Sequence, residues 1–182
     1  MFDYSQIENM RRAISSLKEL MGTINEITGA MAAYGLDDSL SVDAGGLVEL
    51  ELQRFLLYLM ASDGVIADEE VALINRLFDC EFSAPQWKEV IVDTDTYTND
   101  FARTPLLSLR IAAYADEYMR IHGGEDVDVV GNVINGFAMF GKTFVSIDDD
   151  VTDSEVDDLT DYISMLRNSV GDARRQARLR LI

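Results

Sequence analysis

The stretch FLLYLMASDGVIADEEVALI, residues 55–74, decides which fold this sequence predicts. Its first seven residues are all apolar, which is typical of a helix buried on every side. An acidic turn, Ser62 to Ala67, comes next, and apolar residues then recur at helical spacing from Val71. The segment therefore predicts a central helix, a tight acidic turn and a second helix.

The same pattern returns 85 residues later as FGKTFVSIDDDVTDSEVDDL, residues 140–159. Phe55 aligns with Phe140, and Asp63 aligns with Asp148. Two copies of a helix–turn–helix unit in one chain predict a bundle with an internal pseudo-duplication.

Each copy carries a signal for the start of its second helix. Thr152 and Glu155 have the spacing of a capping box, in which a hydroxyl and a carboxylate each accept a hydrogen bond from a backbone amide. Glu70 holds the same position in the first copy, but Ala67 replaces the capping threonine. Because alanine has no side-chain acceptor, we expect the first cap to be weaker by about 1 kcal/mol.

Helical spacing of apolar residues continues over nearly all of the chain, and no segment requires a strand. We predict an all-α, compact bundle of about seven helices, at residues 6–34, 47–62, 68–78, 84–92, 105–121, 127–147 and 153–170. This pattern divides the chain into a long N-terminal helix with its loop (1–46), a helical domain (47–170) and a basic C-terminal tail (171–182).

The N-terminal helix has a narrow apolar stripe that resembles a coiled-coil seam. Its residues are Ile7, Met10, Ile14, Leu17, Met21 and Ile24. Two interpretations remain open: the helix lies across its own domain, or it pairs with a partner helix, a second copy included.

The 33 acidic residues outnumber the 15 lysines and arginines, so the formal net charge is −18. This charge argues against binding to nucleic acid, whose phosphates require clustered cations, and favours a cation or a cationic protein as partner. Four of the basic residues, Arg174, Arg175, Arg178 and Arg180, lie in the tail, where we expect them to offset the acidic body. No apolar run reaches the roughly 20 residues of a membrane span, so we expect no membrane insertion and a cytoplasmic protein.

The acidic turns are the candidate functional site. Carboxylate oxygens suit hard cations such as Ca²⁺ and Mg²⁺, and crowded carboxylates gain from a nearby positive charge. The candidate ligands are Asp63, Asp68, Glu69, Glu70, Asp148, Asp149, Asp150, Asp153 and Glu155. The same residues in first helical turns also stabilise those helices through the macrodipole, which is the structural alternative. An EF-hand is excluded, because aligning Gly64 with the invariant loop glycine puts Leu59 and Ala61 at ligand positions.

Residues for catalysis are scarce. The chain has one cysteine, Cys80, beside two acids that disfavour its thiolate, and one histidine, His122, at a predicted helix end. Neither a nucleophile–base pair nor a histidine ligand set is apparent, so we predict that the protein is not an enzyme.

The first copy resembles the TerB-like family, which is named for a tellurite-resistance protein. Asp63, Gly64, Ile66, Glu69 and Glu70 match its Asp-Gly turn and acidic first helical turn. The resemblance implies a pseudo-duplicated bundle and a non-enzymatic stress-response module. Combined with the charge density of the acidic turns, it leads us to expect that these turns bind a divalent cation or a basic protein. The second copy departs from the family pattern, because Asp149 replaces the turn glycine. The alternative function is an adaptor whose interface is the long N-terminal helix, with purely structural turns.

Overall fold

The computed structural model describes residues 4–36, 42–62, 64, 66–93, 103–124, 127–146 and 152–182. Within these ranges the backbone forms eight helices and no strand. They are α1 (Tyr4–Thr28), α2 (Ala30–Ala33), α3 (Ala44–Met60), α4 (Asp68–Leu77), α5 (Ala84–Asp93), α6 (Leu107–Ile121), α7 (Val129–Val145) and α8 (Asp153–Leu181). The prediction of a compact all-α bundle is confirmed.

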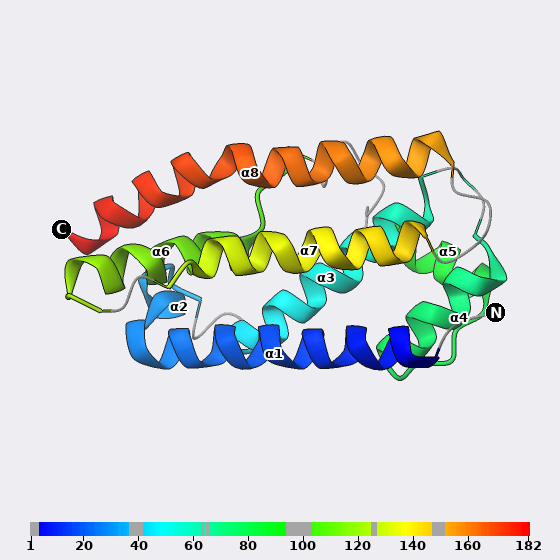
Figure 1. Cartoon of the computed structure of the whole chain (residues 1–182), viewed down its shortest axis with the longest axis horizontal. Coiled ribbons are helices and arrows are strands. Elements are labelled where there is room, and N and C mark those ends of the chain that lie inside the picture. Colours follow the sequence, from blue (N-terminus) through cyan, green and yellow to red (C-terminus); the bar gives the residue numbers. More distant parts are fainter. Residues whose placement is uncertain are drawn as a thin grey trace.

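The helices form an elongated bundle, with α1 and α8 along opposite long edges and α6 and α7 between them (Figure 1). The most extensive packing joins α6 to α8 and α1 to α3. The short helices α4 and α5 lie at one end, where α7 ends and α8 begins, whereas α2 and the end of α8 lie at the other (Figure 1).

The apolar stripe of α1 faces the interior of its own chain. All six of its residues are buried, with Met21 completely inaccessible, and they belong to the single core cluster. Of the two interpretations left open by the sequence, the structure shows the helix lying across its own domain. A partner of α1 would have to use its other faces.

The predicted helix over residues 6–34 is divided in the structure. Gly29 adopts a left-handed conformation (φ 60°) between α1 and α2, a conformation that glycine tolerates without steric cost. The Asn25 side chain stabilises the break by accepting a hydrogen bond from the Met31 amide at 2.8 Å. Gly35, also left-handed, follows α2, as its position predicted.

The predicted basic tail continues α8 without a break. Ala173 and Ala177 are buried in this part of the helix, and small side chains allow its backbone to approach its neighbours closely. Residues 171–181 therefore belong structurally to the bundle's longest helix.

The aligned residues that precede the second helix of each sequence repeat have similar backbone angles. Ala67 and Thr152 precede α4 and α8 with nearly the same extended angles, φ −75° and ψ 148° against φ −88° and ψ 149°. Phe55 and Phe140, the aligned aromatic residues of α3 and α7, are both completely buried. Gly141 allows α7 to pack closely against α8, because a Cβ at this position would lie 2.4 Å from Leu159 Cδ1.

Candidate functional site

The first turn of α8 and the residues that follow α3 are in contact at one end of the bundle. The Ser154 hydroxyl, in the first turn of α8, donates a hydrogen bond of 3.1 Å to the carbonyl of Ser62, just after α3. This contact bridges 92 residues of sequence. We call the described, at least partly exposed carboxylates in the first turn of α4 and the first three turns of α8 the acidic end; they are Asp68, Glu69, Asp153, Asp157, Asp158 and Asp161.

Two of the predicted metal ligands have a capping role instead. Glu70 and Glu155 are buried, and each carboxylate accepts a hydrogen bond of 2.8 Å from the amide of the residue preceding its helix, Ala67 or Thr152. Thr152 completes its capping box by accepting from the Glu155 amide at 3.2 Å. The capping box predicted for Thr152 and Glu155 is therefore present, and Glu70 makes the equivalent hydrogen bond in the first copy.

The remaining predicted ligands fall into two groups. Asp68, Glu69 and Asp153 are exposed on the acidic end. The others lie outside the described residues: Asp63, Asp148, Asp149 and Asp150. Among the residues that the structure describes, no three acidic, histidine or cysteine side chains are grouped closely enough to hold a metal ion.

Asp158 shows what crowding does to this surface. Its carboxyl is partly buried, and this burial raises its pKa above the ordinary 3.8, although a hydrogen bond from Tyr58 opposes the shift. The neighbouring Asp161 and Asp157 raise the pKa further through charge repulsion. A positive charge brought to this surface would relieve that repulsion.

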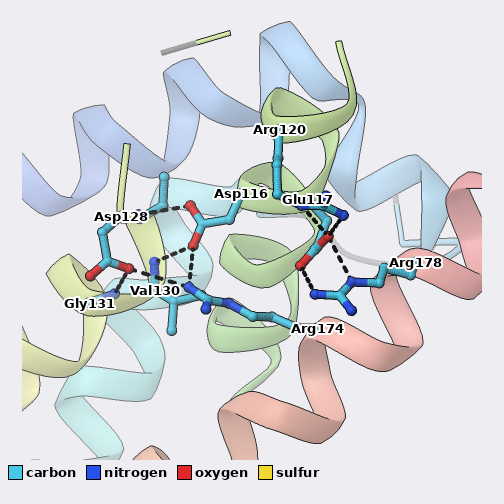
Figure 2. Close-up of polar contacts among 9 residues, drawn as sticks. Asp116, Glu117, Arg120, Asp128, Val130, Gly131, Arg174 and Arg178 are labelled. Carbon is cyan, nitrogen blue, oxygen red and sulfur yellow. Dashed lines mark hydrogen bonds and ion pairs between the residues drawn. The ribbon is translucent and has the colours of Figure 1, made fainter. Parts of the chain in front are cut away.

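A second polar cluster joins α6, α7 and α8 towards the other end of the bundle (Figure 2). Asp116 on α6 accepts hydrogen bonds from the amides of Val129 and Val130, at 2.9 and 3.3 Å, and so caps the start of α7. Arg174 of α8 lies 3.5 Å from Asp116 and 3.6 Å from Asp128. Burial raises the pKa of Asp116, while the two amides and Arg174 oppose that rise.

Glu117, the next residue, binds α8 more tightly. Arg178 donates to both of its carboxylate oxygens at 2.9 Å, and Arg120 adds a second ion pair at 2.5 Å (Figure 2). The hydrogen bonds from Arg178 lower the pKa of Glu117 to about 2, although the buried setting acts in the opposite direction. The three arginines of this cluster are matched by three carboxylates, Asp116, Glu117 and Asp128. The cluster therefore joins the helices and has no excess charge for a ligand.

Glu51 on α3 is a third carboxylate whose role the sequence did not reveal. It accepts hydrogen bonds from the amides of Leu107 and Ser108, at 2.7 and 3.1 Å, and so caps the start of α6. Burial raises the pKa of Glu51 to about 7. Like Asp116, it caps a helix distant in sequence, which no local spacing reveals.

The surroundings of Cys80 and His122 show no arrangement for catalysis among the described residues. Burial raises the pKa of the Cys80 thiol, with Asp79 adding to the effect, so the thiolate is disfavoured as predicted. His122 follows the end of α6, where its Nδ1 lies 2.8 Å from the Tyr118 carbonyl and its ring stacks on Tyr118.

Within the described part of the chain, no helix is long and apolar enough to cross a membrane. In comparisons with known proteins, no family model, curated protein or solved structure matches this chain.

Proposed function

We propose that this protein is a non-enzymatic binding module whose acidic end takes up a basic segment of a partner protein. The hydrogen bond between Ser154 and Ser62 carries the proposal, because it joins the segment that precedes α4 to the first turn of α8, and both helices begin with exposed carboxylates. The raised pKa of Asp158 supports it, since ionisation there is opposed by burial and by neighbouring charges that a cationic ligand would offset. A stress-response role of the TerB-like kind is part of this proposal and rests on the sequence resemblance.

A basic protein segment fits the described geometry better than a single metal ion. The exposed carboxylates Asp68, Glu69 and Asp153 lie on two different helices, and several lysines or arginines can pair with such a spread surface. A weak Ca²⁺ or Mg²⁺ site depends chiefly on Asp63 and the run 148–150, outside the described residues. The adaptor alternative loses its main support, because the apolar stripe of α1 is buried.

The experiment compares two variants that remove equal charge. One carries Asp68→Asn, Glu69→Gln and Asp153→Asn at the acidic end. The matched control carries Glu19→Gln, Glu26→Gln and Glu89→Gln, which are exposed residues of other surfaces. Binding of a fluorescein-labelled lysine- and arginine-rich peptide is measured by fluorescence polarisation at physiological salt.

We expect the acidic-end variant to bind the peptide about tenfold more weakly, because exposed ion pairs contribute about 0.5 kcal/mol each. The control should retain most of the affinity. Equal losses in both variants would mean that net charge alone attracts the peptide, which would refute a defined site. Calorimetric titration with CaCl₂ and with MgCl₂ tests the cation separately, and the absence of heat would remove it from the proposal.

A further inference from the structure

An apolar groove of about 360 Å³ lies between α3, α5 and the loop that joins α4 to α5. Its apolar lining consists of Leu50, Leu57, Phe82, Trp87 and Val90. Leu57 and Trp87 are buried, whereas Leu50 and Phe82 are 50% and 39% exposed. A second, more polar hollow of about 730 Å³ adjoins it, since Cys80 and Phe82 line both.

The Asn75 side chain fixes the part of the loop that forms one side of the groove. Asn75 of α4 accepts hydrogen bonds from the Phe82 amide at 3.1 Å and from the Trp87 indole at 3.0 Å. Its amide nitrogen also donates to the Phe82 carbonyl at 2.7 Å. A side of the groove that is already ordered loses little conformational entropy on binding, which favours a preformed recognition surface.

The charges along the two hollows differ from those of the chain as a whole. Three arginines line them, Arg11, Arg54 and Arg76, against the two carboxylates of Asp79 and Glu81. One of these carboxylates, Asp79, is already paired with Arg11 at 2.5 Å. The Debye length is about 8 Å at physiological salt, so a ligand here responds mainly to this local, cationic lining and only weakly to the distant acidic residues.

We propose that the groove binds a short amphipathic segment of a partner protein, with a bulky apolar side chain seated against Leu50, Phe82 and Trp87. Carboxylates flanking that side chain pair with the arginines beside the groove, Arg54 first, because it lines the apolar part. Burial of the exposed parts of Leu50 and Phe82 supplies the hydrophobic contribution. This surface has the opposite ligand preference to the acidic end, so the two can serve different partners.

The test uses a fluorescein-labelled helical peptide of about 12 residues, or three turns, with leucine and tryptophan on one face and glutamate elsewhere. Fluorescence polarisation measures its affinity for the wild-type protein and for the Leu50→Asp and Arg54→Gln variants. Both substitutions are at exposed positions, and thermal unfolding checks that the fold is retained. Met139→Asp is the matched control, because Met139 is 43% exposed on α7 and does not line the groove.

We expect Leu50→Asp to weaken peptide binding at least tenfold and Arg54→Gln to weaken it severalfold, with Met139→Asp unchanged. A peptide with lysine in place of glutamate should bind more weakly than the glutamate peptide. Failure of the wild-type protein to bind the glutamate peptide, or equal affinity for both peptides, overturns the proposal. Dimerisation in sedimentation experiments that Leu50→Asp abolishes also overturns it, because a second copy then occupies the groove. Binding of the basic peptide at the acidic end should be unaffected by Leu50→Asp, so the two proposals fail separately.

Discussion

The second helices of the two sequence repeats begin in the same way but differ in their caps and in their lengths. Ala67 and Thr152 have nearly identical extended angles, although only threonine has a side chain that can cap a helix. Both copies have a glutamate three residues later. In each copy its carboxylate accepts a hydrogen bond from the amide of Ala67 or Thr152. The comparison indicates that Glu70 and Glu155 define the turn, while the capping hydroxyl adds stability in one copy only.

The copies also differ in the helix that follows the turn. Helix α4 has 10 residues and ends before Asp79, which is left-handed (φ 51°), whereas α8 has 29 residues and runs along the bundle. Arg174 and Arg178 hold the far part of α8 to α6. The short helix of the first copy leaves room for the loop that forms the groove. The long helix of the second copy braces the whole bundle.

The largest effect is expected where the copies pack differently. Leu56 is completely buried in α3, and its aligned position in α7 is Gly141. Leu56→Ala should lower the free energy of unfolding by about 3 kcal/mol, since it leaves a cavity. Gly141→Ala should also destabilise, by about 1 kcal/mol, because overpacking against Leu159 costs about 2 kcal/mol and the better helix propensity of alanine returns about 1.

Urea unfolding measures both changes, and Gly171→Ala is the control. Gly171 is also within a helix, but no heavy atom lies within 4 Å of a Cβ built there. This variant should therefore be stabilised by about 1 kcal/mol through helix propensity alone. If Gly141→Ala were equally stabilising, close packing at this glycine would not be what separates the copies.

The next effect concerns the shared glutamates. Glu70→Ala should destabilise by about 2 kcal/mol and Glu155→Ala by about 1 kcal/mol, because each removes the acceptor of the amide that precedes the helix. Glu155→Ala also removes the acceptor of the Thr152 hydroxyl. The loss is larger in the first copy, where Ala67 offers no capping side chain, whereas Thr152 still accepts from the amide of residue 155. Urea unfolding of both variants measures this difference, with Glu70→Gln and Glu155→Gln as controls that keep an acceptor oxygen. A larger loss at Glu155 would contradict this account of the caps.

Exchanging the capping residues should reduce the difference between the copies. Ala67→Thr should stabilise the protein by about 1 kcal/mol, because the extended backbone there already matches that of Thr152. Thr152→Ala should destabilise it by a similar amount. Thermal unfolding of the two single variants and of the double exchange measures these effects, which should nearly cancel when combined. No gain from Ala67→Thr would show that this turn cannot accommodate the hydroxyl.

The sequence predicted the features of this fold that depend on neighbouring residues. Apolar spacing predicted the helices, and the repeat predicted two turns with matching glutamates, because caps and amphipathic faces are local. The break at Gly29 was missed, since a glycine within a helical pattern is often tolerated and only its left-handed φ shows that the helix ends.

The contacts that join distant segments could not be predicted. Glu51 and Asp116 cap the starts of α6 and α7 from other helices, and their sequence neighbours give no sign of it. The spacing of Arg174 and Arg178 places both on one face of α8, but their carboxylate partners lie about 60 residues away.

For the acidic end, the sequence predicted that the two turns converge. The contact between Ser154 and Ser62 joins the first turn of α8 to the residues after α3, while Asp63 and Asp148 lie outside the described residues. That Glu70 and Glu155 are buried as caps, and so not available to a ligand, could be seen only in the structure.

The smallest expected effect is a pH dependence of stability that arises from a charged residue present in the second copy only. Asp158 occupies the position that the buried, apolar Leu73 holds in the first copy. A carboxyl whose pKa is raised on folding binds its proton more readily in the folded state, so stability falls as pH rises from the ordinary 3.8 through the raised pKa. Asp158→Asn should remove this fall, which we expect to be about 0.5 kcal/mol because the group is partly exposed to solvent.

Urea unfolding across that pH range compares the wild-type protein with Asp158→Asn, and Asp172→Asn, on the same helix near Arg175, is the control. Identical profiles for wild type and Asp158→Asn would show that crowding at the acidic end does not affect stability. A saturating basic peptide should shift the wild-type transition to lower pH, because added positive charge favours the ionised carboxyl. The same peptide should leave the Asp158→Asn profile nearly unchanged. This difference links the stability of the second copy directly to occupancy of its acidic surface.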